Sequence, residues 1–374
     1  MFENPFKNKT VLVTGHSGFQ GGWLSFWLNT LGAKVVGYSL ELPSEPNLFE
    51  AIELSKDLYR NIRGDVRDFE KLYKVFADHR PDMVFHLAAQ SLVRPSYKSP
   101  ALTYETNVMG TVNVLEAARQ TKSVRVIVIV TSDKCYKNQE WIWGYRENDP
   151  MGGHDPYSSS KGCAELVTAA YENSFFPPEK YGADHEVGVA TVRVGNVIGG
   201  GDWGEDRLMP DCVRSINQDK DIVIRYPKAI RPWQHVLEPL YGYLLLGAKL
   251  WKKAPRYIGA WNFGSTDGKL WTVEDIAKKI CNVWGNVKCV IDPDPHPHEA
   301  HSLTIDSSKA RIMLDWNPQF KVAEALEKTI DWYKVYYQGA GPNELKRHTA
   351  HQIEAYCLGT RDMGDRENDS SNVP

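Results

Sequence analysis

The sequence predicts an α/β fold, a Rossmann-type doubly wound parallel sheet with a smaller C-terminal domain. Short β-branched runs alternate with amphipathic helical stretches through the first half of the chain, and a glycine-rich turn follows the first run. After about Gly195, glycine, proline and tryptophan become frequent and helices are fewer. Near-continuous apolar strands that alternate with helices are typical of a parallel sheet covered on both faces.

The expected strands are short apolar runs, at residues 10–14, 34–38, 83–87, 125–130 and 187–192. The first expected helix, at 23–31, is closed by Gly32. The next helix, at 107–119, is expected to place these apolar side chains on one face: Val108, Val112, Leu115 and Ala118.

Two further helices are expected in the second half of the chain. Residues 272–275 read Thr-Val-Glu-Asp, a capping box that opens a helix to Trp284, with Ile276, Ile280 and Val283 facing inward. Residues 322–336 form another amphipathic helix. Residues 359–374 contain almost no apolar side chains and are expected to form a flexible tail.

Composition excludes several classes of protein. The 374 residues carry a net charge of −3 and no basic run, which argues against a nucleic-acid partner. The N-terminus lacks the apolar core of a signal peptide, and the longest purely apolar stretch, 126–130, is far too short to span a membrane. Six cysteines are scattered without a Cys-x-x-Cys pair. We therefore expect a cytoplasmic protein with free thiols and no membrane association.

A phosphate-binding loop is predicted between the first strand and the first helix. Gly15 can make the tight turn, Gly18 lets the backbone approach a pyrophosphate, and Gly21 lets the helix pack on the strand. The helix N-terminus then offers unpaired N–H groups to the phosphates. The spacing is Gly-x-x-Gly-x-x-Gly, and its place between strand and helix favours a dinucleotide site over an empty glycine-rich turn.

The cofactor is predicted to be NAD. No Lys or Arg occurs between Val35 and Glu53, so the end of the second strand offers no partner for the extra phosphate of NADP. Glu41 lies a few residues later than the acid that usually binds the adenosine ribose. Asp65 and Val66 are placed either to hold the adenine edge or to form a surface turn before a helix at Asp68.

Tyr157 and Lys161 are the candidate proton-transfer pair. They stand four residues apart, so on a helix they share one face. A phenol with a pKa near 10 is a poor base at neutral pH. An adjacent ammonium and a positively charged nicotinamide are expected to lower that pKa.

Polar residues follow the strand that precedes this helix. Ser132, Asp133 and Lys134 come directly after the apolar run 125–130. The carboxyl end of a parallel strand faces the ligand crevice in such folds. The segment 292–301 also contains His, Asp and Glu, but its prolines keep these side chains from sharing a helical face, and no metal site is expected.

Together the motifs resemble the extended short-chain dehydrogenases/reductases over about residues 8 to 340. The shared strings are Thr14-Gly-x-x-Gly-x-x-Gly21, His86-Leu-Ala-Ala89, Thr106-Asn-Val-Met-Gly-Thr-Val-Asn113, Tyr157-Ser-Ser-Ser-Lys161 and Arg231-Pro-Trp-Gln-His-Val236. Within that family the chain most resembles the nucleotide-sugar 4,6-dehydratases. The strings at 131–136, 195–203 and 298–301 resemble the branch that acts on CDP-glucose.

The resemblance implies a lyase that converts CDP-D-glucose to CDP-4-keto-6-deoxy-D-glucose for deoxysugar biosynthesis, such as that of the O-antigen of lipopolysaccharide. The 4-hydroxyl is oxidised, water leaves across C5–C6, and hydride returns to C6, so NAD is regenerated. Tyr157 would be the base for the 4-hydroxyl, Lys161 would bind the nicotinamide ribose, Ser132 would bind the 4-hydroxyl, and Asp133 would protonate the leaving 6-hydroxyl. Lys134 stands where relatives carry a Glu that removes the C5 proton, which leaves the identity of that base open.

The resemblance also implies the binding residues. Those for the cofactor are Gly15, His16, Ser17, Gly18, Phe19, Gln20, Gly21, Asp65, Val66, Leu87, Ala88, Ala89, Asn107, Tyr157 and Lys161. Those for the substrate are Gln90, Asn196, Arg207, Arg231, Asn262 and Glu299. Among these, Arg207 and Arg231 suit a diphosphate because a guanidinium can bind it in bidentate fashion.

The expected domains are residues 1–194 for NAD, with segments near 229–262 returning to that domain, and 195–350 for the nucleotide sugar. Homodimers through the helix that carries Tyr157 are common in the family, so a homo-oligomer is expected. Three alternatives stay open: a dehydratase for another nucleotide sugar, a nucleotide-sugar 4-epimerase, and a dinucleotide-sensing protein without chemistry. Asp133 speaks against the epimerase, and the presence of both Tyr157 and Lys161 speaks against the sensor.

Overall fold

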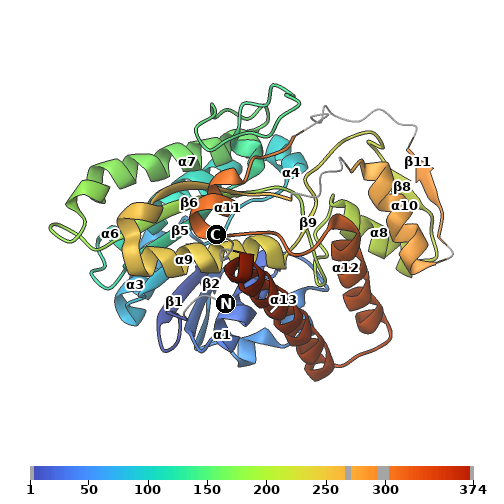
Figure 1. Cartoon of the computed structure of the whole chain (residues 1–374), viewed down its shortest axis with the longest axis horizontal. Coiled ribbons are helices and arrows are strands. Elements are labelled where there is room, and N and C mark those ends of the chain that lie inside the picture. Colours follow the sequence, from blue (N-terminus) through green and yellow to red (C-terminus); the bar gives the residue numbers. More distant parts are fainter. Residues whose placement is uncertain (1–3, 266–270, 286, 293–302, 371–374) are drawn as a thin grey trace.

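A computed structural model describes residues 4–265, 271–285, 287–292 and 303–370, with side chains described up to Thr360 (Figure 1). Within these residues, seven parallel strands form one sheet in the order β10-β6-β5-β4-β1-β2-β3. Their bounds are β1 Thr10–Thr14, β2 Lys34–Ser39, β3 Arg60–Arg63, β4 Met83–His86, β5 Val126–Val130, β6 Gly188–Val194 and β10 Gly259–Phe263. The predicted Rossmann-type parallel sheet is confirmed.

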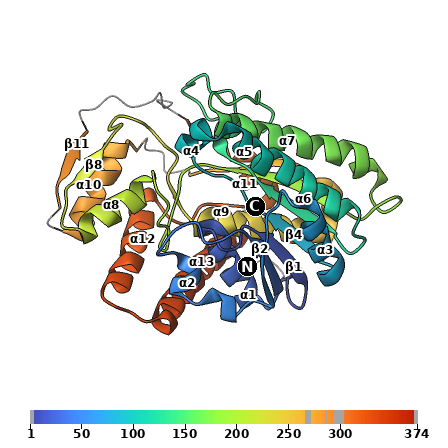
Figure 2. The same cartoon turned by 180° about the vertical axis from the view of Figure 1, so that it is seen from behind.

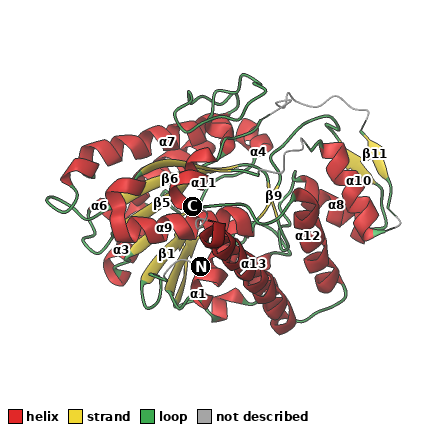
Figure 3. Cartoon of the chain, in the orientation of Figure 1, coloured by secondary structure: helices red, strands yellow, loops and turns green. Residues whose placement is uncertain are grey.

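Helices cover both faces of the sheet (Figure 3). One face packs against α1 (Phe19–Thr30) and α9 (Leu237–Tyr257), and the other against α3 (Phe69–His79), α6 (Gly110–Arg119) and α7 (Pro156–Phe175). Successive strand residues alternate between the two cores, because side chains of a strand point to opposite faces in turn. Along β5, for example, Val128 belongs to one core and Ile127 to the other.

Short elements complete the first lobe. They are α2 Leu48–Ala51, η1 Leu54–Lys56, α4 Val93–Lys98, α5 Pro100–Tyr104, a π-turn η2 Glu105–Met109, η3 Asp133–Cys135 and η4 Pro178–Lys180. Figure 2 shows α4, α5, α6 and α7 together on one side of the molecule.

Three local expectations differ from the structure. Helix α1 begins at Phe19, directly after the phosphate loop, rather than at Trp23. A π-turn precedes α6, and the buried face of α6 includes Val114 and Ala117, while Val108 and Val112 are only half-buried. Strand β3 was not expected, because this edge strand has only one apolar residue, Ile62, and is largely polar.

The chain returns to the sheet after Gly195, near which the regular alternation of strands and helices ends. Helix α9 packs against β5 and β6, and β10 pairs with β6 as the edge strand beyond it. Between and after these elements lies a second lobe, seen at one side of Figure 1. Its elements are α8 Leu208–Asn217, α10 Val273–Trp284, α12 Val322–Tyr337, and the strand pairs β7 Val197–Ile198 with β9 Gln234–His235 and β8 Ile222–Ile224 with β11 Cys289–Ile291. The capping box at Thr272 and Asp275 is present.

Helix α11 (Ser308–Leu314) lies beside β10, and α13 (Pro342–Ser370) ends the described chain. The backbone is helical to Ser370, although a loose tail was expected from residue 359. No proline occurs between Pro342 and Pro374 to end the helix earlier. Among the described helices, none is both long and apolar enough to cross a membrane.

Candidate active site

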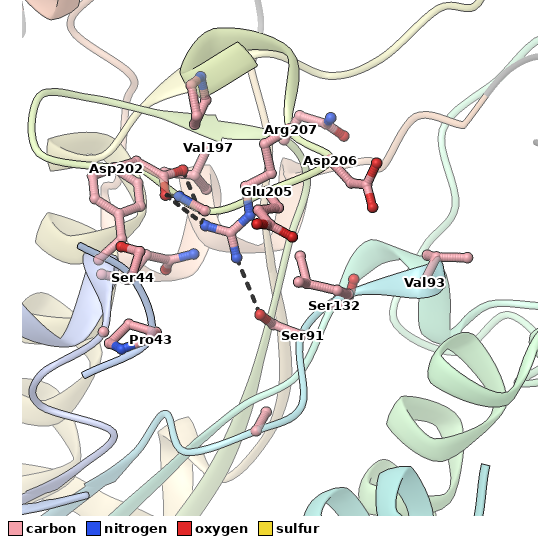
Figure 4. A pocket seen from close by; sticks show the side chains of 18 of the residues that line it. Pro43, Ser44, Ser91, Val93, Ser132, Val197, Asp202, Glu205, Asp206 and Arg207 are labelled. Carbon is pink, nitrogen blue, oxygen red and sulfur yellow. Dashed lines mark hydrogen bonds and ion pairs between the residues drawn. The ribbon is translucent and has the colours of Figure 1, made fainter. Parts of the chain in front are cut away.

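A cavity of about 900 Å³ lies at the carboxyl ends of the parallel strands, between the sheet and the second lobe (Figure 4). Segments that directly follow five strands line it: Gly15 after β1, Leu40 after β2, Leu87 after β4, Thr131 after β5 and Gly195 after β6. Ligands of open parallel α/β sheets bind at this edge. The fold therefore brings distant parts of the sequence to one site.

The phosphate loop forms one wall of this cavity. Gly15 has φ +72°, and a Cβ there would lie 2.7 Å from the backbone nitrogen of Ala88. A Cβ on Gly21 would lie 2.0 Å from the carbonyl oxygen of Gly15. Gly18 is the N-cap of α1 and provides no side-chain cap, so the first N–H groups of that helix stay available to a ligand. These glycines thus let the backbone turn closely enough to hold a pyrophosphate.

The rest of the loop divides between cavity and core. Ser17, Phe19 and Gln20 line the cavity, and the Ser17 hydroxyl lies 2.8 Å from that of Ser39 at the end of β2. His16 is fully buried, with Nε2 2.8 Å from Asn61 Oδ1, so its side chain does not reach a ligand in the cavity. Burial lowers the pKa of His16 to about 4, which keeps the ring neutral. Its expected cofactor contact is therefore limited to its backbone.

The end of β2 and the turn after β3 form the next part of the wall. Ser39, Leu40 and Glu41 line the cavity after β2 without a cationic side chain. Asp65 and Val66 also line it, and Tyr38 Oη donates to the carbonyl oxygen of Asp65 at 2.8 Å.

Asn107 and Gln90, which were expected to contact the ligands, instead hold the backbone of the loop after β4. Leu87, Ala88 and Ala89 line the cavity. Asn107 does not, because its amide bonds the backbone N–H and C=O of Gln90 at 2.8 and 2.9 Å and the Ser160 hydroxyl at 2.8 Å. The Gln90 side chain bonds Leu92 and Thr103 and also lies outside the cavity lining. Asn107 and Gln90 thus position the backbone of this loop.

Tyr157 and Lys161 lie on the first turns of α7, which Asp155 caps by accepting from the Ser158 N–H at 2.9 Å. Both side chains line the cavity, and both are buried. Tyr157 hydrogen-bonds the Ser132 side chain, and Lys161 Nζ donates to the carbonyl oxygen of Val130 at 3.1 Å. The pair therefore contacts the end of β5.

The electrostatics of this pair correct one expectation. Burial raises the pKa of Tyr157 to about 12, whereas the sequence led us to expect a lowered value. The hydrogen bond with Ser132 and the charge of Arg207 lower the pKa of Tyr157, but they do not outweigh desolvation. Burial likewise lowers the pKa of Lys161 to about 8, against the charge of Glu165. The phenolate therefore needs further positive charge beside it.

Asp133 is prepared to donate a proton. It is buried, and burial raises the pKa of its carboxyl above the usual range, against the charges of Lys134 and Arg231. Ser132 Oγ donates to Asp133 Oδ1 at 3.0 Å, while Oδ2 has no hydrogen-bond partner among the described residues. Lys134 lines the cavity beside it and donates its backbone N–H to Ser132 Oγ at 3.2 Å. A buried carboxyl with a raised pKa and one oxygen without a partner among the described residues suits a general acid.

An arginine cluster lines the part of the cavity toward the second lobe. Its members are Arg94, Arg207, Arg214, Arg225 and Arg231. Arg207 pairs with Asp202 at 2.9 Å and donates to Ser91 Oγ at 3.1 Å, as Figure 4 shows. Arg231 is buried and donates to the carbonyl oxygen of Ile230 at 2.8 Å. Several converging guanidinium groups suit an anionic ligand such as a diphosphate.

Three of these arginines were missed by sequence reasoning. Arg94, on α4, pairs with Asp206 across the cavity at 3.1 Å, and Arg225 pairs with the same carboxylate at 2.7 Å. Arg214 pairs with Asp211. None of the three arginines lies in a recognised motif, so nothing in the sequence distinguishes them from surface residues.

The remaining expected substrate residues have different positions. Asn196 lines the cavity. Asn262 is fully buried and outside the lining, because its amide is bonded to the Tyr136 hydroxyl and to the carbonyl oxygens of Tyr145 and Asp306. Asn262 therefore holds the loops behind the site. Glu299 lies outside the described residues, as does most of the 292–301 segment that was considered for metal.

The chain is similar to proteins of one family over most of its length. A family model described as GDP-mannose 4,6 dehydratase matches residues 12–329. The chain is 51% identical over 338 residues to the CDP-glucose 4,6-dehydratase of Salmonella typhimurium, covering 90% of this chain and 94% of that protein. It is 24% identical over 362 residues to a dTDP-glucose 4,6-dehydratase of Xanthomonas campestris, covering 90% and 98%.

Solved structures show the same fold. An epimerase from Methanothermobacter thermautotrophicus has a TM-score of 0.75 at 25% identity and covers 90% of this chain and 95% of its own. The dTDP-glucose 4,6-dehydratase of Bacillus anthracis in complex with NAD has a TM-score of 0.74 at 21% identity, covering 88% and 98%.

Proposed function

The chain belongs to the GDP-mannose 4,6-dehydratase family, and from this membership we propose that it is an NAD-dependent lyase that dehydrates CDP-D-glucose to CDP-4-keto-6-deoxy-D-glucose. The observation that carries the proposal is the 51% identity to a CDP-glucose 4,6-dehydratase over 90% of the chain. The cavity, with its dinucleotide loop at one side and its arginine cluster at the other, fits a cofactor beside a nucleotide diphosphate.

The residues of the phosphate loop and the wall formed by Asp65 and Val66 would hold the dinucleotide. When bound, NAD would take hydride from C4 and return it to C6. The positive charge of its nicotinamide would favour the phenolate form of Tyr157. Tyr157 accepts the proton of the sugar 4-hydroxyl. Ser132, whose side chain already hydrogen-bonds Tyr157, orients the same 4-hydroxyl. Lys161 donates to the Val130 carbonyl at the end of β5 and would also bind the ribose of the cofactor.

The elimination step uses the other side of the same strand end. Asp133, whose carboxyl pKa is raised by burial, donates its proton to the 6-hydroxyl as water leaves. For the C5 proton, we propose that Tyr157 acts again as base after it has released the 4-hydroxyl proton to solvent and returned to the phenolate, and that Lys134 positions groups beside Asp133.

The role of Lys134 is tested with Lys134→Met and solvent-deuterium exchange at C5. Exchange at a substantial fraction of the wild-type rate supports Tyr157 as the base. Loss of exchange while C4 oxidation continues would assign the base to Lys134.

The substrate is tested by incubation with CDP-, dTDP-, UDP- and GDP-hexoses, followed by the base-dependent absorbance of a 4-keto-6-deoxy product. We expect product from CDP-glucose without added reductant or stoichiometric NAD. Substrate deuterated at C4 should give product deuterated at C6. Loss of the label to solvent, or conversion to a 4-epimer without dehydration, would contradict the proposal.

We also propose that the enzyme is a cytoplasmic homo-oligomer. Its six cysteines are free in the structure, which suits a reducing compartment. Leu102, Met109 and Leu166 are exposed on α5, η2 and α7, elements that pack against one another on one side of the molecule (Figure 2). A second copy of the chain would cover such a patch. Sedimentation of Leu166→Glu as a smaller species than wild type would support this assembly.

A further inference from the structure

Glu165 is a buried carboxylate that none of the proposed steps uses. It lies on α7 one helical turn beyond Lys161 and two turns beyond Tyr157, and only 5% of its surface is exposed. It does not line the cavity. A buried carboxylate is costly unless its oxygens are bonded and its charge is paired, so its contacts show what it holds in place.

The two oxygens of Glu165 join α7 to two neighbouring strands. Oε1 accepts a hydrogen bond from the Thr131 hydroxyl at the end of β5. Oε2 accepts from the Thr191 hydroxyl on β6 at 2.7 Å and forms an ion pair with Arg193 at 2.7 Å. Because Arg193 is itself buried, the pair is a fixed internal connection rather than a mobile surface contact.

Thr131 is the residue that leads into the catalytic groups of the strand end. Ser132 and Asp133 follow it directly, and Val130, just before it, accepts the hydrogen bond from Lys161. Val130, the last residue of β5, is thus tied to α7 through Lys161, and Thr131, which follows it, is tied to α7 through Glu165.

We propose that Glu165 is a positioning residue, which fixes Ser132 and Asp133 relative to Tyr157 and Lys161 through its bond to Thr131. Proton transfer requires hydrogen-bond distances between the acid or base and the reacting oxygen. A displacement of about 1 Å at such a site can cost about a hundredfold in rate. Loss of this positioning should therefore slow the chemical steps and leave substrate binding by the arginine cluster unchanged. The inference rests on the proposed function for its reaction steps.

The structure offers a matched pair of variants for the test. Glu165→Ala would leave Arg193 buried without its partner and could unfold the protein. Thr131→Val and Thr191→Val each remove one hydroxyl from the same carboxylate at nearly constant volume. Thr131 continues into Ser132 and Asp133 and itself lines the cavity, whereas Thr191 does neither, so a constant KM is needed to show that the valine at position 131 has not disturbed ligand binding. Thr131→Ser restores the hydroxyl.

The test compares kcat, KM and Tm of these variants, with the sugar nucleotide that the unaltered enzyme turns over as the assay substrate. The expected result is a similar loss of Tm in both valine variants, a fall in kcat of about tenfold or more in Thr131→Val alone at nearly constant KM, and recovery of kcat in Thr131→Ser. Equal kcat values in the two valine variants would overturn the proposal, as would no recovery with serine. A failure of the proposed substrate shows separately, in the unaltered enzyme with CDP-glucose.

Discussion

The two sides of the cavity hold their charged groups in different ways. At the catalytic edge, formed by Ser132, Asp133, Tyr157 and Lys161, every side chain is buried, and desolvation shifts the pKa values of Asp133, Tyr157 and Lys161 toward their neutral forms. In the arginine cluster most guanidinium groups are partly exposed and paired with carboxylates. Under the proposed function, the first arrangement would control proton transfer, and the second would provide ion pairs that a diphosphate can replace.

This difference has an energetic basis. Exposed ion pairs contribute about 0–1 kcal/mol, so exchanging Asp206 for a ligand anion costs Arg94 and Arg225 little. Buried groups pay a desolvation cost that the fold must compensate, as Glu165 and Arg193 do for each other. Substitutions at the catalytic edge should therefore change kcat, and substitutions in the arginine cluster should change KM.

The largest expected effect is that of Tyr157→Phe. Removing the phenol hydroxyl removes the proton acceptor, and we expect kcat to fall by about a hundredfold or more with little change in substrate affinity. Steady-state kinetics and equilibrium binding measure the two quantities. A variant with near wild-type kcat would show that another group accepts the proton.

A smaller effect is expected for Arg231→Gln. Because Arg231 is buried beside the cavity, we expect KM to rise by about tenfold to a hundredfold with a smaller change in kcat. Arg94→Gln is the matched control from the exposed part of the cluster, and its KM should rise less and depend more on salt. If Arg94→Gln has the larger effect, burial does not determine the strength of diphosphate binding.

The cofactor preference should be smaller again. No cationic side chain among Ser39, Leu40 and Glu41 faces a 2′-phosphate, so NAD should bind more tightly than NADP, by about tenfold. Fluorescence titration with both dinucleotides measures the ratio. The reverse order would mean that Arg63 or Arg67 reaches the phosphate, and Arg63→Gln and Arg67→Gln would identify which one.

The smallest expected effect is the change in Tm when the buried carboxyl of Asp133 is removed. A folded-state pKa above the unfolded value means that stability is complete below the unfolded pKa, near 3.9, and is lost as pH rises through the folded pKa. Asp133→Asn removes this cost, so its Tm should exceed that of wild type by about 2 °C at pH 8 while kcat falls. The difference should shrink as pH is lowered toward 4. A Tm below that of wild type at pH 8 would show that burial of the Asp133 carboxyl does not destabilise the folded protein.

Local patterns in the sequence were sufficient for the sheet and for the main motifs. The apolar runs predicted five of the seven strands of the large sheet, and glycine spacing located the phosphate loop between strand and helix. Tyr157 and Lys161 were chosen as the candidate pair because their spacing of four residues places them on one helical face and because they follow a parallel strand and a glycine-rich loop, and their roles stay a prediction. Strand β3 was missed, since a polar edge strand has no apolar signal, and β10 was indicated only as part of a segment returning to the sheet.

Only the tertiary structure decided which of the motif residues face the cavity and what charge they carry. His16 and Asn262 belong to recognised motifs, but Phe49, Asn61, Tyr136 and Tyr145 enclose or bond them, so their side chains do not line the cavity. The pKa of Tyr157 is raised because elements far apart in the sequence remove water from its hydroxyl. Desolvation depends on all of the atoms around a group, whereas a motif specifies only its neighbours along the chain. For the same reason Arg94 and Arg225 could be assigned to the site only after folding had brought both to Asp206.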